Sequence, residues 1–144
     1  MGMQQAIRSA AVGLLYDYAT DADVTLQVYA GRPRSIAPPT GFVDTVGETL
    51  DHTTNLTKRF PTASIILIHG IYDTLEAANQ KDAFMDGFIT WCEARYHAAG
   101  ANTLLAISES EDLPNYVPEW MPPEQQKVYY ATRITLEGYA LIGS

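Results

Sequence analysis

The alternation of apolar and polar residues divides the chain into helical and extended segments. Apolar side chains recur every three or four positions over Gln4–Tyr18 and again between Asp73 and Gly100, which predicts two amphipathic helices. Extended patterns cover the ranges 24–30, 42–50, 62–70, 103–108 and 127–142. These two helices and about five strands, in the order α-β-β-β-α-β-β, predict an α+β fold with a mixed, mainly antiparallel sheet.

Two of the predicted extended segments are unusually long. The Thr- and Asn-rich segment Asp51–Arg59 joins the second strand to the third, so we interpret Phe42–Gly70 as a long projecting hairpin with an exposed polar tip. The terminal segment Lys127–Ile142 alternates throughout and exceeds the usual strand length of about 3–10 residues. Such a strand either bends at Gly138 or extends past its own sheet to pair with something else.

The second helix has the strongest pattern. Asp73, with Glu76 three residues later, resembles a capping box, and Gly100 is the expected C-terminal cap. Its apolar stripe consists of Phe84, Met85, Phe88, Trp91 and Cys92. Because Cys92 is the single cysteine and lies in this stripe, we expect it to be a small buried hydrophobe without a disulfide partner.

Composition predicts one domain, residues 1–144, in a reducing environment and outside membranes. The 47% hydrophobic content suits a packed core, and the longest apolar run, Ile65–Ile68, is far too short to span a bilayer. The N-terminus lacks the apolar region of a signal peptide. Of the net charge of −8, residues 61–144 carry −7, from eleven acidic and four basic residues. This balance is the opposite of a nucleic-acid-binding domain and would repel DNA.

The stretch Ser64–Asp73 contains the best catalytic candidate, His69-Gly70. A buried strand that ends in His-Gly before a helix is also how the oxyanion-hole strand of an α/β-hydrolase ends. No serine lies in a Gly-x-Ser-x-Gly elbow, however, and His97 is the only histidine after this point. We therefore interpret His69-Gly70 as a strand-to-helix corner and keep a small hydrolase as the weaker alternative.

Other chemical motifs are missing from the sequence. The three histidines are far apart, and no HExxH, CxxC, GxGxxG or GxxxxGK[ST] pattern occurs. Glu109, Glu111 and Asp112 lack the alternating oxygen ligands of an EF-hand, so we expect a solvated acidic turn. The sequence thus predicts no catalytic residues, no cofactor and no metal site.

Local patterns along nearly the whole chain resemble one family. The segments are Val28–Pro33, Ile66–Asp73, the helix with Phe84, Phe88 and Trp91, and Tyr130–Gly138. In this order they resemble the tail terminator (tail completion) proteins of long-tailed phages and gene-transfer particles.

The resemblance implies a structural virion protein without catalytic residues. It implies a ring, usually a hexamer, that caps the tail tube and meets the head-side connector, made in the host cytoplasm, with DNA passing without specific binding. Another neck component, a head-tail connector or head-completion protein, is the alternative. The hairpin and the terminal strand supply our candidate contact residues: Thr54, Lys58, Arg59, Tyr129 and Arg133. Glu109, Glu111 and Asp112 are candidates for an acidic lumen or loop.

Overall fold

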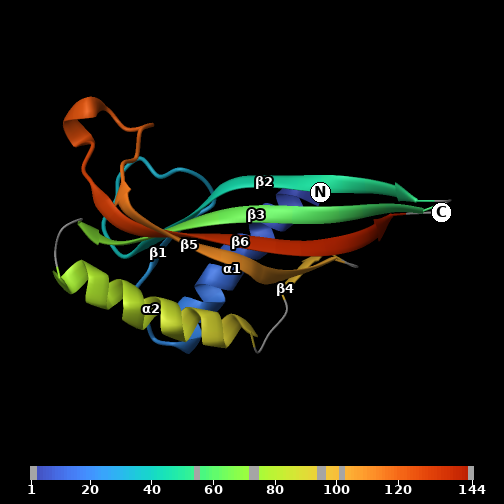
Figure 1. Ribbon diagram of the computed structural model, residues 1–144, viewed down its shortest axis with the longest axis horizontal. Coiled ribbons are helices and arrows are strands. Elements are labelled where there is room, and N and C mark those ends of the chain that lie inside the picture. Colours follow the sequence, from blue (N-terminus) through green and yellow to red (C-terminus); the bar gives the residue numbers. More distant parts are fainter. Residues whose placement is uncertain (1–2, 54–55, 72–74, 94–96, 101–102, 143–144) are drawn as a thin grey trace.

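The computed structural model describes residues 3–53, 56–71, 75–93, 97–100 and 103–142 (Figure 1). Its elements are α1 (Met3–Asp21), β1 (Gln27–Tyr29), β2 (Thr40–Thr53), β3 (Leu56–Ile71), α2 (Leu75–Glu93), β4 (His97–Gly100), β5 (Thr103–Tyr116), the 3-10 helix η1 (Pro123–Gln125) and β6 (Tyr129–Ile142). The predicted α+β class, with two helices and a mixed sheet, is confirmed. One more strand than expected, β4, is present.

The strand order in the sheet is β1-β2-β3-β6-β5-β4. β1 and β2 are parallel, and every other neighbouring pair is antiparallel. Of the two alternatives considered for the terminal strand, extension past its own sheet is wrong, because β6 lies between β3 and β5 and pairs with β3 as far as Ile142. Both of its faces are buried, with Ile134 and Leu136 on one side and Ala131 on the other, and such a strand belongs in the centre of a sheet.

The predicted hairpin is formed by β2 and β3, but its turn is much shorter than expected. The two strands pair from Thr40↔Ile68 to Thr53↔Leu56, with one bulge between Val43 and Thr45, and β6 joins β3 as far as Thr57↔Ile142. The segment interpreted as a turn is mostly strand because threonine, being β-branched, suits an extended backbone. Figure 1 shows these three strands projecting beyond both helices. We call this projecting end, residues 48–53, 56–61 and 139–142, the arm.

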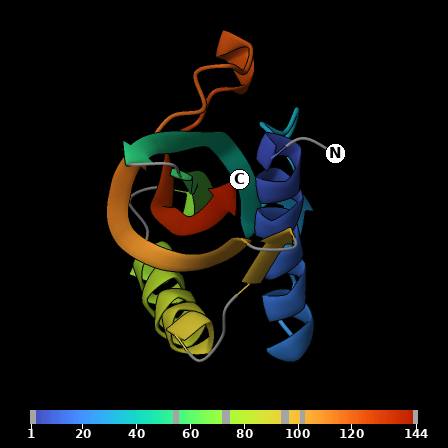
Figure 2. The ribbon, with the colours of Figure 1, turned by 90° about the vertical axis from the view of Figure 1, so that its right-hand side faces the viewer.

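Both helices cover one face of the sheet (Figures 1 and 2). The helical period of α1 buries Ile7, Ala11, Leu14, Leu15 and Tyr18, and α2 adds Met85, Phe88 and Cys92. The ring of Tyr18 makes edge contacts with Phe84, Phe88 and Trp91, at centroid distances of 5.3, 5.1 and 5.5 Å. The stripe predicted for α2 is therefore confirmed as core.

The end of α2 was placed wrongly. The helix stops at Glu93, and Gly100 ends the short strand β4, which pairs with the start of β5. Pairing of His97 with Leu105 and of Ala98 with Leu104 makes this segment extended, so the sheet takes residues that the helical pattern assigned to α2. The proposed cap at Asp73 lies outside the described residues.

Candidate functional site

A bulge in β3 turns His69 toward the helices. The register of β3 with β6 shifts between Ile68 and Gly70, and the His69 side chain is 4% exposed. Its Nε2 lies 3.0 Å from Oγ1 of Thr132, and its ring meets the edge of Phe84 at 5.6 Å. Burial, followed by the positive charge of Lys81, lowers the pKa of His69 from 6.5 to about 4. The imidazole is therefore neutral at pH 7.

A cavity of about 620 Å³ lies beside His69, between the ends of α1 and β3 and the start of α2. Its described lining is mainly apolar and consists of Tyr18, Val24, Pro38, Pro39, His69, Gly70, Ile71, Glu76, Ala77, Gln80, Ala83 and Phe84. We call it the β3-end pocket. A Cβ at Gly70 would lie 3.1 Å from Cβ of Ala77, so glycine allows β3 and α2 to approach closely here.

Among its described residues, the pocket does not combine a nucleophile with a general base. Its described lining contains no serine or cysteine that would act as a nucleophile. One nitrogen of His69 is already within hydrogen-bond distance of Thr132, and its pKa lies well below the range that suits a general base near neutral pH. Within the described part of the chain, no three His, Cys, Asp or Glu residues are grouped in a way that would hold a metal ion.

The acidic residues predicted to form a turn lie on a strand instead. β5 continues to Tyr116, with exposed side chains from Ser108 to Asp112 and a bulge after Ile107. An edge strand tolerates charged side chains because part of its surface remains in water. The turn predicted for this segment is therefore wrong.

The same strand separates the three acidic residues between its two faces. Glu109 pairs with Thr135 of β6, and Glu111 pairs with Arg133. Both glutamates therefore lie on the face of the sheet that the helices do not cover. Asp112 lies on the helix-bearing face, where its carboxylate is 3.1 Å from Nζ of Lys81 in α2. Only Glu109 and Glu111 therefore remain candidates for a common acidic surface.

A row of polar residues crosses the sheet on this helix-free face. Pairing through four neighbouring strands places Thr45, Ser64, Thr135 and Glu109 side by side. Among the described side chains, Ser64 Oγ is the one buried polar atom without a hydrogen-bond partner. This row is thus built from hydroxyl and carboxylate groups rather than from apolar side chains, and the guanidinium of Arg133 lies beside it on the same face.

The candidate contact residues have different positions. Tyr129 is 4% exposed and belongs to the core with Phe42, Ile66, Ile68 and Ala131, so placing it on a surface was wrong. Arg133 is partly exposed and lies 3.6 Å from the carboxylate of Glu111. Lys58 and Arg59 lie in the arm, where their backbones pair with both β2 and β6. Thr54 lies outside the described residues.

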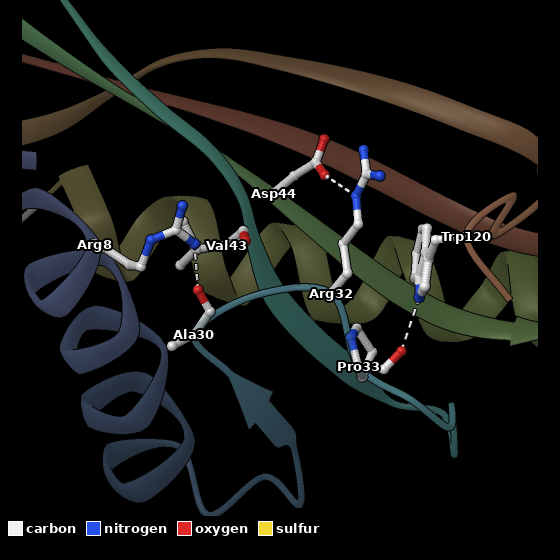
Figure 3. Close-up of polar contacts among 7 residues, drawn as sticks. All are labelled: Arg8, Ala30, Arg32, Pro33, Val43, Asp44 and Trp120. Atoms are coloured by element: carbon white, nitrogen blue, oxygen red, sulfur yellow. Dashed lines mark hydrogen bonds and ion pairs between the residues drawn. The ribbon is translucent and has the colours of Figure 1, made fainter. Parts of the chain in front are cut away.

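A polar clamp that the sequence did not predict holds two loops over the helix-free face (Figure 3). Arg32 Nε is 3.1 Å from Asp44 Oδ1, and the guanidinium lies 5.2 Å from the ring centroid of Trp120. Trp120 Nε1 donates to the carbonyl of Pro33 at 2.8 Å. Arg8 donates to the carbonyls of Ala30 and Val43. The Gly-Arg-Pro sequence and the Pro-rich loop around Trp120 were visible, but nothing in the sequence pairs them.

No family model matches the chain, and no curated protein matches it. Neither helix of the described structure is long and apolar enough to cross a membrane.

Proposed function

We propose that this chain is a structural subunit of a ring that terminates the tail tube of a long-tailed phage or gene-transfer particle and meets the head-side connector. The arm is the observation that carries the proposal. A three-stranded projection that lies beyond both helices suits a ring subunit, which needs a rigid element that reaches its neighbour.

The unpaired edges of the sheet support the same role. β1 pairs with β2 only as far as Phe42, and β4 pairs with β5 only as far as Leu105. Beyond these residues, the outer backbone edges of β2 and β5 have no strand partner within the described structure. Edges of this kind are available to other chains, and they suit a protein that assembles.

The charge pattern fits a passage for DNA. In our proposal Glu109 and Glu111 face the bore of the ring, where carboxylates repel phosphate and keep DNA mobile. The hydroxyl groups of the neighbouring polar row offer no positive charge to hold a phosphate. Asp112 takes no part, because it pairs with Lys81 on the other face.

Electron microscopy of the purified protein mixed with tail tubes tests the proposal. We expect rings at one end of each tube, together with a mass from light scattering that is a multiple of the 15.9 kDa subunit. A protein that stays monomeric in every condition and never joins the tubes would contradict it. Binding to the connector in preference to the tube would favour the alternative neck component.

A further inference from the structure

Three of the four exposed large apolar side chains of the described structure lie on strand β3 or beside its end. The exposed large apolar residues of the described structure are Tyr16, Phe60, Ile71 and Val128. Phe60 lies in the arm and is 36% exposed. Ile71 is 52% exposed at the opposite end, where it lines the β3-end pocket, and Val128 directly precedes its pairing partner Tyr129. One strand thus links two separate apolar surfaces.

The β3-end pocket has the size and lining of a binding site. Its volume of about 620 Å³ falls within the range of about 300–1,000 Å³ that is usual for ligand pockets. Apolar side chains from α1, the 24–39 segment and α2 surround it, while Glu76 and Gln80 supply polar groups. Such a lining suits an aromatic side chain accompanied by positive charge.

Charge distinguishes the arm from the rest of the molecule. The arm carries two acidic residues, Glu48 and Asp51, and two basic residues, Lys58 and Arg59, so all of the net charge of −8 lies elsewhere. In contrast, α2, which borders the pocket, has four acidic residues and one basic residue. Two copies therefore repel each other over most of their surfaces, and the arm is the segment that approaches α2 with the least repulsion.

We propose that the β3-end pocket of one copy receives the arm of a second copy, with Phe60 entering the apolar lining and Lys58-Arg59 approaching the acidic side of α2. This contact rests on the proposed ring function and names the two surfaces that build the ring. It is heterologous, since each copy uses a different surface toward each neighbour, and such contacts close into rings when the rotation permits.

The length of β3 keeps the arm and the β3-end pocket of one chain apart. Phe60 and Ile71 are eleven positions apart in β3, which at about 3.3 Å a residue separates the two surfaces by roughly 36 Å, so the arm cannot reach the pocket of its own chain. The occupant must therefore come from another copy.

A mixing experiment with two variants tests this contact. Phe60→Asp replaces the apolar side chain of the arm that would enter the pocket. Ala83→Trp places a large side chain in the pocket, at a position of α2 that is exposed and so tolerates the change. We expect each variant alone to remain monomeric in sedimentation velocity, where the unchanged protein forms rings. A 1:1 mixture should form heterodimers and nothing larger, because one intact pocket and one intact arm remain. Phe60→Leu and Ala83→Ser are the matched controls and should assemble like the unchanged protein.

The possible outcomes distinguish a failure of the proposed arm-to-pocket contact from a failure of the ring proposal. If both variants still form rings, or if the mixture stays monomeric while circular dichroism shows both chains folded, the arm-to-pocket contact is wrong and the ring proposal stands. If the unchanged protein never associates, with or without tail tubes, both proposals fall. Dimers formed by a single variant alone would indicate a symmetric contact and also overturn the inference.

Discussion

Gly87 of α2 makes room for the hydroxyl of Tyr18 from α1. A Cβ at position 87 would lie 2.7 Å from the Tyr18 oxygen. The Tyr18 ring cannot turn aside easily, because three aromatic side chains of α2 hold it by edge contacts. The contact of the Tyr18 side chain with α2 therefore depends on the absence of a side chain at position 87.

We expect Gly87→Ala to lower the free energy of unfolding by about 1 kcal/mol, because overpacking costs about 1–3 kcal/mol and helix propensity returns about 1 kcal/mol. Gly13→Ala in α1 is the matched control. A Cβ there meets nothing within 4 Å, so the same change should raise stability by about 0.5–1 kcal/mol. Urea denaturation measures the free energy of unfolding of both variants, and changes of the same sign would refute this account of the contact between Tyr18 and Gly87.

His69 should make stability fall at acidic pH. Its pKa is about 4 in the folded chain, against 6.5 for an unperturbed histidine, so between these values the unfolded state binds more protons. Its contribution is fully present above pH 6.5 and is lost as the pH falls toward 4, amounting to about 3 kcal/mol. The difference in unfolding free energy between the unchanged protein and His69→Gln, followed from pH 7 to 4, measures it. A constant difference would show that the ring is not buried in its neutral form.

Trp120→Phe should weaken the polar clamp while keeping an aromatic ring in place. The change removes the hydrogen bond to the Pro33 carbonyl, and we expect a loss of about 1–2 kcal/mol in unfolding free energy. Trp91→Phe is the control, since Nε1 of Trp91 donates to the exposed carboxylate of Asp21 and should matter less. Circular dichroism in urea compares the two, and a larger loss for Trp91→Phe would argue against the clamp.

The acidic side chains of β5 should protect its open edge. Replacing Glu109 and Glu111 together by valine removes two charges from a strand whose outer edge is unpaired, so we expect faster aggregation at equal concentration. Light scattering over time measures the effect. The double variant Glu119→Val with Glu124→Val removes the same charge from the loop before β6 and should remain soluble. Similar aggregation of both variants would point to net charge alone.

Sequence periodicity was sufficient for the helices and for the existence of the hairpin, because those patterns are local. The buried positions of α1 follow the helical period, and Val24 and Leu26 lie against the same core as expected. Position within the sheet is not local. Whether Lys127–Ile142 lies at an edge depends on β3 and β5, and both of its faces proved to be buried.

The candidate site was harder to predict for the same reason. Asp112 seemed equivalent to Glu109 and Glu111 until pairing with Lys81, 31 residues earlier, assigned it to the other face. The hydrogen bond of Trp120 joins it to a residue 87 positions away. The β3-end pocket combines segments from α1, β3 and α2. No spacing in the sequence brings such residues together, whereas folding does.

The central position of β6 has a consequence for how the chain folds. β2 and β3 are neighbours in sequence and close through a short connection, but β6 must find β3 across a long intervening stretch of chain. Contacts between residues so far apart in sequence form slowly, because much chain entropy is lost before they are made. β6 also leaves the ribosome after the other five strands. Until it arrives, β3 and β5 each expose an inner edge, and this is the interval in which the nascent chain is most open to mispairing.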